Sequence, residues 1–265
     1  MHFQHDVVLR LKRALYGAKG EPYRINGYAL RYLPGTRPVR TRYANSKSSV
    51  ARYDALQVLW MTTHLKEGDI ALDIGAYQGA YTLLMAAQCG QTGKVVAFEP
   101  DPYAHAVLVK NLSLNPLIRR PVVEDCACSD KIGYGTLFSL GGNSQSSLAR
   151  SAVEFSSALR SEEIQITTVT IDSYLSQHRL SSPRCIKIDA EGAEIRILKG
   201  ATQILASNSD VLCELHPYAW SEFGNTLSDL KQVAAASRRR IRYLGQDCEI
   251  GDQVEYGTVQ LERYF

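Results

Sequence analysis

Short apolar runs alternate with stretches of helical periodicity along most of this chain. The apolar runs are IALDIG (70–75), KVVAFEP (94–100), PVVEDCACSD (121–130), RCIKIDAEG (184–192) and VLCELHP (211–217). Helical periodicity marks 79–89, 102–114, 193–205 and 226–237, a strand and short helix fall near 168–175, and β-prone runs near 241–244 and 254–261. Apolar strands that alternate with helices are typical of a parallel sheet covered on both faces. We therefore predict an α/β fold with a doubly wound, mostly parallel sheet.

The N-terminal segment carries a different pattern. Apolar residues fall on one face of a predicted helix with basic residues interleaved: Val7, Val8, Leu11 and Leu15, with Arg10, Lys12 and Arg13. This helix could lie on a membrane, or pack on the body or on a second subunit of a homo-oligomer, and packing is the commoner outcome. Residues 23–33 hold Asn26-Gly27 between β-prone runs, which predicts a hairpin. We divide the chain into an N-terminal extension, 1–48, and a main domain, 49–265, that opens with a helix.

Composition narrows the class of protein. The chain has 265 residues, of which 45% are hydrophobic and 22% charged, so a disordered or collagen-like protein is excluded. No run approaches the roughly 20 apolar residues that a membrane span needs. The N-terminus lacks the apolar core of a secretory signal, and the six cysteines show no C-x-x-C spacing. We expect reduced thiols and a cytoplasmic location.

Charge is unevenly distributed. The net charge is +3, but residues 1–52 hold 11 Lys and Arg against 2 Asp and Glu, so the remainder is acidic. A basic arm on an acidic body suits an anionic partner, such as a phosphorylated carrier, a membrane surface or an acidic polymer. The plainer alternative is that these side chains solvate a surface arm.

The clearest motif follows the first strand of the main domain. Residues 73–79 read Asp-Ile-Gly-Ala-Tyr-Gln-Gly, and a helix follows. Gly75 allows a turn where a side chain would clash, Gly79 allows close approach to the strand, and the helix presents free N–H groups. Asp73 would repel a phosphate and attract a cation. The motif favours a ligand with ammonium and sulfonium groups, although a purely structural turn has the same pattern.

Two further strand ends suit an adenosine. Glu99 ends the second strand, where a carboxylate can accept both hydroxyls of a ribose. Pro100 offers an apolar surface to an adenine ring, and Asp125 and the backbone of Cys126 offer it hydrogen bonds. Alternatively, Glu99 is a surface acid and Asp125 a helix cap. Together the three strand ends predict an adenosyl ligand.

Five blocks, in order, resemble the FkbM-type S-adenosylmethionine (SAM)-dependent methyltransferases. They are LDIGAYQGAYT, VVAFEPDP, the Asn-Ser-x-Ser-Ser-Leu segment, IKIDAEGAE-x-x-x-L-x-G and CELHP, within about residues 24–260. Tyr77-Gln78 departs mildly from the family pattern. The resemblance implies a class I methyltransferase, with a seven-stranded Rossmann-like sheet whose last strand is antiparallel. It also implies O-methylation, often of a sugar or natural-product hydroxyl.

The resemblance further implies where SAM binds. The methionine end of SAM would contact Asp73, Gly75, Ala76, Tyr77 and Gly79, and its carboxylate would contact Tyr81 and Thr82. Glu99 would hold the ribose, and Pro100, Asp125 and Cys126 would contact the adenine. Asp189 would lie beside the methyl group.

Acceptor chemistry is predicted at two later strand ends. Asp189 ends the fourth strand, and Glu214 and His216, two residues apart after the fifth, share a face that could meet it. His216 is the candidate general base at neutral pH, or it only bonds a loop and shapes the pocket. We predict Asp189, Glu214 and His216 as catalytic residues.

Two further roles near these strand ends are considered, a metal site and a helix cap. Asp189, Glu214 and His216 could hold Mg²⁺ or Mn²⁺ and orient a diol, but they lack a fixed ligand spacing, so we predict no metal site. Glu194 lies in the next predicted helix, where it would cap the helix or pair with a basic residue of the same helix.

The predicted function is transfer of a methyl group from SAM to a hydroxyl of a sugar, glycan or secondary metabolite. An N-methyltransferase would usually carry an Asn/Asp-Pro-Pro-aromatic motif after the fourth strand, where residues 189–192 read Asp-Ala-Glu-Gly. A second alternative is an idle SAM-binding scaffold that acts on nucleic acid through its basic arm. The acceptor itself is not identified by the sequence.

Overall fold

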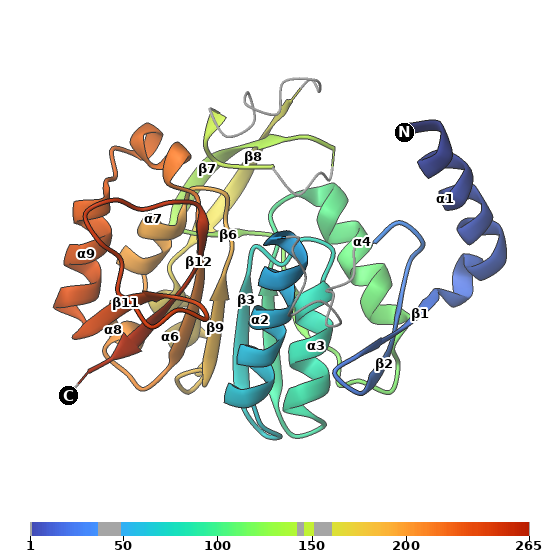
Figure 1. Cartoon of the computed structure of the whole chain (residues 1–265), viewed down its shortest axis with the longest axis horizontal. Helices are drawn as coiled ribbons and strands as arrows, with labels where there is room; N and C mark the ends of the chain where they lie inside the picture. The colour runs from blue at the N-terminus through green and yellow to red at the C-terminus, as the bar shows by residue number, and fades with distance from the viewer. Residues whose placement is uncertain (1, 37–48, 142–145, 151–160, 265) are drawn as a thin grey trace.

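The computed structural model describes residues 2–36, 49–141, 146–150 and 161–264 (Figure 1). Its α-helices are α1 His2–Tyr16, α2 Ser49–His64, α3 Ala80–Cys89, α4 Pro102–Ser113, α6 Ile171–Gln177, α7 Glu194–Lys199, α8 Thr202–Leu205 and α9 Leu227–Ala236, with 3₁₀-helices η1 Gly17–Lys19 and η2 Pro217–Phe223. Its strands are β1 Glu21–Ile25, β2 Tyr28–Tyr32, β3 Ile70–Ile74, β4 Lys94–Phe98, β5 Val122–Glu124, β6 Ala127–Cys128, β7 Gly133–Ser139, β8 Glu162–Val169, β9 Cys185–Ile188, β10 Asp210–Leu215, β11 Arg239–Tyr243 and β12 Gly257–Arg263.

The main sheet has seven strands in the order β11-β12-β10-β9-β3-β4-β5. The pairs from β10 to β5 are parallel, whereas β12 runs antiparallel to both of its neighbours. The predicted α/β, doubly wound, mostly parallel sheet with an antiparallel last strand is confirmed. Its order reverses between β3 and β9, which places a topological switch point at their carboxyl ends.

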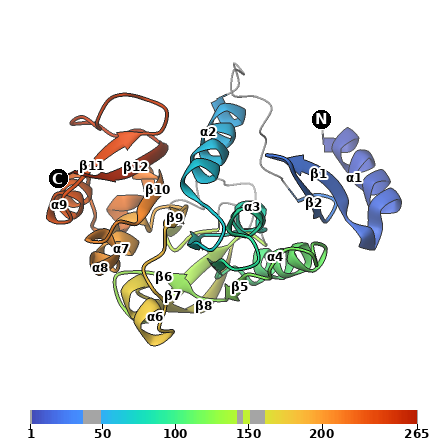
Figure 2. The ribbon, with the colours of Figure 1, turned by 90° about the horizontal axis from the view of Figure 1, so that it is seen from below.

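Alternation along the strands divides the core into two layers. In β3, Ala71 packs with α2 and α3, while Leu72 and Ile74 pack with α6, α7, α8 and α9 on the other face. Figure 2 shows α2, α3 and α4 on one side of the sheet and α6, α7 and α8 on the other. Both faces of the central strands β3, β4, β9 and β10 are buried because these strands are mostly apolar.

A second sheet was not predicted. It has three strands in the order β6-β8-β7, with β7 antiparallel to β8 over seven residue pairs. The strand β7 contains two glycines, and its first four residues are not buried, so its sequence carries little strand signal. Between β7 and β8, residues 142–145 and 151–160 lie outside the described residues.

The predicted hairpin is confirmed as β1 and β2. Asn26 and Gly27 both have positive φ, as a two-residue type I′ turn requires. Tyr32 is fully buried against residues of α3 and α4. The side chain of Asn111 accepts a hydrogen bond from the Leu33 amide at 2.7 Å, so the hairpin is part of the core.

The predicted helix is present as α1. Its apolar face does not pack on the body, because Val7, Val8, Leu11 and Leu15 are exposed, and packing on a membrane or a second subunit stays a prediction. The boundary at residue 48 lies outside the described residues and stays a prediction. Within the described chain, no helix combines the length and apolar character that crossing a bilayer demands.

Candidate active site

A cavity of about 520 Å³ opens at the carboxyl ends of β3, β4 and β9. Ile74, Phe98 and Asp189 mark those strand ends in its wall. Ala127 of β6 and Leu137 of β7 line it from the second sheet, so the sheet that the sequence did not predict forms one wall of the site. The volume is ordinary for a small-ligand pocket, and it lies at the switch point, where open α/β sheets bind ligands.

Gly75 shapes the turn between β3 and α3. Its φ is +75°, and a Cβ there would overlap the carbonyl oxygen of Asp189. The amides of Gly75 and Ala76 both donate to the Phe98 carbonyl at 3.0 Å. The absence of a side chain therefore lets β3 and β9 approach closely where Gly75 lines the cavity.

Glu99 is held in place by backbone amides. Its carboxylate accepts hydrogen bonds from Tyr77 N at 2.6 Å and Asp101 N at 2.9 Å. Burial raises the pKa of Glu99 to about 8, although the two amides oppose that shift. Both carboxylate oxygens are fixed in the cavity wall, in an arrangement that can accept hydrogen bonds from a diol.

Asp73 lies in a buried layer next to the cavity. One of its oxygens accepts a hydrogen bond from the Thr82 hydroxyl at 2.5 Å, and the other has no partner among the described residues. Burial raises the pKa of Asp73, and the nearby ammonium of Lys187 opposes this. Neither Asp73 nor Thr82 lines the cavity, so their predicted contacts with SAM stay predictions.

The structure brings most of the other predicted cofactor residues to one cavity. Those that line it are Gly75, Ala76, Tyr77, Tyr81, Glu99, Pro100, Cys126 and Asp189. Gly79 and Asp125 do not line it. Gly79 starts α3 with φ +82°, against Leu108, and Asp125 is exposed.

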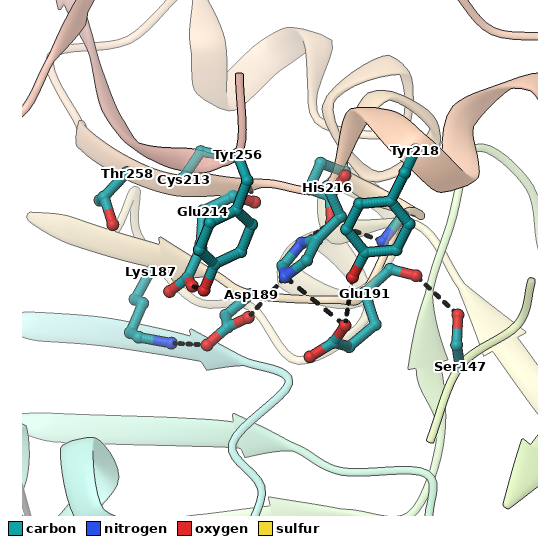
Figure 3. A network of polar contacts seen from close by, with 12 residues as sticks. Ser147, Lys187, Asp189, Glu191, Cys213, Glu214, His216, Tyr218, Tyr256 and Thr258 are labelled. Atoms are coloured by element: carbon teal, nitrogen blue, oxygen red, sulfur yellow. Dashed lines mark hydrogen bonds and ion pairs between the residues drawn. The ribbon is translucent and has the colours of Figure 1, made fainter. Parts of the chain in front are cut away.

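The ammonium of Lys187 is buried beneath the acceptor side of the cavity. It bonds to Asp189 Oδ2 at 3.0 Å and lies 4.8 Å from the ring centroid of Tyr81 (Figure 3). Burial alone would raise the pKa of Asp189, but the charges of Lys187 and His216 lower it below its usual value. Asp189 is therefore ionised at neutral pH and a weak proton acceptor.

His216 is fixed by a carboxylate that the sequence analysis misassigned. Glu194 is fully buried and accepts hydrogen bonds from His216 Nδ1 at 2.9 Å, Trp220 Nε1 at 2.8 Å and Gly192 N at 2.7 Å. Burial lowers the pKa of His216, but Glu194 and the neighbouring carboxylates outweigh that effect and raise it to about 10. The imidazole of His216 is therefore protonated on both nitrogens and positively charged at neutral pH.

The expected pairing of Glu194 within its own helix is wrong. Arg196 pairs instead with Asp130 at 2.7 Å and Lys199 with Asp229 at 2.9 Å. Glu194 turns inward because the tertiary packing of η2 brings Trp220 and His216 to it, which no local pattern reveals.

Glu191 is a candidate that the sequence analysis missed. It lines the cavity with φ +47°, a conformation that is uncommon for a residue other than glycine. Its carboxylate lies 3.2 Å from the Tyr218 hydroxyl and 3.5 Å from His216 Nε2, and its carbonyl accepts a hydrogen bond from Ser147 (Figure 3). Burial raises the pKa of Glu191 to about 7, with His216 opposing. The signal available was an acid directly before a glycine at a strand end.

Glu214 completes the cluster. It accepts hydrogen bonds from the Tyr256 hydroxyl and from Gln57 Nε2 at 3.3 Å, and burial raises its pKa. One donor atom from each of Asp189, Glu214 and His216 falls within 4.8 Å of the others, so the predicted catalytic residues do converge. The same distances would suit a shared divalent cation, so the expected absence of a metal site stays a prediction.

Figure 3 shows the imidazole of His216 between the rings of Tyr218 and Tyr256. Both contacts are edge-to-face, with ring centroids 5.8 and 5.3 Å from the imidazole. Both tyrosines are about half exposed, so they form an aromatic rim at the acidic side of the site.

Comparison with known proteins agrees with this arrangement. The family described as the Methyltransferase FkbM domain matches residues 73–243. The hexuronic acid methyltransferase AglP of Haloferax volcanii is 26% identical over 151 residues, covering 57% of each chain. The methyltransferase sdnD of Sordaria araneosa is 27% identical over 164 residues, covering 53% of this chain and 63% of that one.

The fold also has a relative among solved structures. The crystal structure of a methyltransferase FkbM from Methylobacillus flagellatus aligns with a TM-score of 0.51 at 17% identity, over 85% of this chain and 48% of that one. The chain thus spans less than two thirds of the length of each of these three relatives.

Proposed function

Because this chain belongs to the FkbM methyltransferase domain family, we propose that it uses SAM to methylate an uncharged hydroxyl of a saccharide, glycan or secondary metabolite. The observation that carries the proposal is a single cavity with two unlike sides. One side holds a glycine turn and a backbone-anchored acid, Gly75 and Glu99. The other holds an acidic cluster around His216.

The first side fits SAM. Gly75 lines the cavity where a side chain would collide with the Asp189 carbonyl, and Glu99 presents both oxygens to a diol. Gly75, Ala76 and Tyr77 would hold the methionine end, Glu99 the ribose, and Cys126 the adenine side. When bound, SAM supplies an electrophilic methyl group on a sulfonium. The cluster of Asp189, Glu191 and Glu214 favours a cation electrostatically in the same cavity.

The second side favours a neutral acceptor. Lys187 is the only Lys or Arg among the described residues that line the cavity, and its ammonium is held by Asp189. The two cations on this side, Lys187 and His216, are already paired with Asp189 and Glu194, so a carboxylate acceptor would find no unpaired counter-charge there. The name of AglP supports a sugar as acceptor but describes an acid, and this chain has acidic groups where an acidic sugar would need basic ones.

Glu191 is proposed as the general base. Its pKa of about 7 suits proton removal from a hydroxyl at neutral pH, and Tyr218 and Ser147 hold the residue. His216, predicted as the base, is proposed instead to carry positive charge that orients Asp189 and Glu191. Asp189 and Glu214 would accept hydrogen bonds from acceptor hydroxyls, and Tyr218 and Tyr256 would stack on a sugar ring.

The test is methyl transfer from labelled SAM to separate pools of neutral glycosides, uronic acids and amines. We expect label in the neutral pool, bound as an ether that survives mild alkali. Label released by alkali as an ester, or found on amines, would overturn the acceptor assignment. Absence of calorimetric affinity for SAM and for its demethylated product would overturn the cofactor. Loss of activity with EDTA that Mg²⁺ restores would favour the metal alternative.

A further inference from the structure

The helix α1 exposes a continuous apolar stripe. Along that stripe Val7 is 43% exposed, Val8 51%, Leu11 65% and Leu15 73%. At 3.6 residues per turn these four positions fall within an arc of about 100°. Isolated exposed apolar residues are common, but four on one helix face form a patch that water solvates poorly.

The opposite face of α1 holds the helix on the body. Leu9, Lys12 and Tyr16 are only partly exposed. The ammonium of Lys12 lies 2.6 Å from the carboxylate of the buried Glu21 of β1. Leu9 packs against Gly35, since a Cβ added to Gly35 would lie 3.1 Å from the Cδ1 of Leu9. Figures 1 and 2 both show α1 at the outer edge of the molecule, beside the hairpin. The stripe therefore points away from the protein.

Exposed basic groups lie on and just after α1. At 100° per residue Arg10 borders the stripe, Arg13 lies on the opposite side of the helix, and Lys19 follows in η1. All three are exposed, and none makes an ion pair with a described side chain. They belong to the strongly basic first 52 residues of the chain. An apolar stripe on a basic segment complements a surface that has negative headgroups above an apolar interior.

A second copy of the chain fits the stripe less well. A stable protein interface buries about 800 Å² on each partner, which one stripe of four aliphatic side chains cannot supply. Two copies would also bring their basic segments together, and like charges repel. A lipid surface needs no such area from the protein, because the whole bilayer is the partner.

We propose that α1 is an interfacial helix that holds this protein reversibly on anionic phospholipid surfaces, with Val7, Val8, Leu11 and Leu15 in the boundary between headgroups and acyl chains. Arg10, at the edge of the stripe, contacts the phosphates, while Arg13 and Lys19 add positive charge near the surface. One such helix gives reversible binding rather than permanent anchoring. The proposal is independent of the reaction at the cavity, which lies among other elements.

The test is co-sedimentation of the full chain with phosphatidylcholine vesicles, with and without phosphatidylglycerol. We expect binding that needs phosphatidylglycerol and weakens with salt. The double variant Leu11→Glu, Leu15→Glu should lower the partition coefficient at least tenfold, since it places two charges in the stripe. Arg10→Gln should lower it about fivefold, from about 1 kcal/mol per cation near an anionic surface.

The matched control is Leu117→Glu, at a leucine that is 89% exposed in the connection between α4 and β5. It should bind vesicles as the unmodified chain does. Equal binding by the stripe variant, or binding that ignores lipid charge, would overturn the proposal. Self-association in light scattering that the stripe variant abolishes, without vesicle binding, would identify a second copy as the occupant instead. Unchanged circular dichroism and SAM affinity confirm that the variants fold.

Discussion

The two sides of the cavity hold their polar groups by different means. On the β3–β4 side, Glu99 is fixed by two backbone amides, and the turn at Gly75 is fixed by hydrogen bonds to the Phe98 carbonyl. On the β9–β10 side, Glu191 and His216 are held mainly by other side chains and by charge. Backbone hydrogen bonds therefore fix the shape of the first side, whereas on the second side neighbouring charges set the protonation states of Glu191 and His216.

This difference separates two kinds of effect. A change on the backbone-held side should alter whether the ligand fits, and so affect binding. A change on the charge-held side should leave the shape but alter which group holds a proton, and so affect turnover and its pH dependence. The contrast would be wrong if substitutions on the backbone-held side mainly changed turnover, or if those on the charge-held side mainly changed ligand binding.

The largest effect is expected from Gly75→Ala. The added Cβ would overlap the Asp189 carbonyl, and φ +75° is strained for alanine. We expect loss of SAM binding in calorimetry and a lower melting temperature. The control is Gly141→Ala, where φ is +66° but no atom of the described residues lies within 4 Å of the new Cβ. That variant isolates the cost of backbone strain, about 1 kcal/mol. Normal SAM affinity in folded Gly75→Ala would show that SAM binding does not need this close backbone approach at Gly75.

Glu191→Gln should have the next largest effect. Glutamine keeps the size and the hydrogen bond with Tyr218 but cannot take a proton at neutral pH. We expect kcat to fall about 100-fold, as for loss of a general base, with SAM affinity changed less than about twofold. Initial rates and calorimetry on the same preparation measure both quantities. Glu249→Gln, at an exposed glutamate, serves as the control. A loss of SAM affinity as large as the loss of rate would assign Glu191 to binding.

The same contrast explains what could be read from the sequence. Gly75 and Glu99 were predicted because their roles depend on local order, a strand followed by a turn or an acid at a strand end. The centre of the sheet was predictable for the same reason, since its strands are mostly apolar. The hairpin was predicted by the Asn26-Gly27 turn, whose positive φ angles few other residues adopt.

The charge-held side could not be read in this way. Glu194 meets His216 only because η2 folds Trp220 and His216 back over α7, 22 or more residues along the chain. Glu191 gains its environment from Ser147 and Tyr218, which come from different segments. A sequence period indicates which face of an element is apolar, but it does not indicate which distant acid shares a buried site with a histidine.

The remaining prediction concerns pH, and its sign can be worked out. If Glu191 is the base, kcat should fall about tenfold per pH unit below about 7 and level off above it, because only the ionised form accepts a proton. The groups that face Glu191 do not obscure this limb. His216 keeps its proton up to a pKa of about 10, the pKa of Asp189 is lowered, and that of Tyr218 is raised. The limb should be absent from the residual activity of Glu191→Gln.

Stability should move in the opposite direction over the same range. Burial raises the folded pKa of Glu191 from 4.5 to about 7 and that of Glu99 to about 8, so the folded chain keeps protons that the unfolded chain has lost. Their contribution to stability is fully present below pH 4.5 and is lost as pH rises through 7 to 8. Melting temperatures should therefore fall as pH rises from about 4.5 to 8, and less steeply in Glu191→Gln, where Glu99 remains. If the fall in rate below pH 7 persists in Glu191→Gln, another residue is the base. If the pH dependence of the melting temperature is the same in Glu191→Gln as in the unmodified chain, Glu191 is ionised as readily in the folded chain as in water.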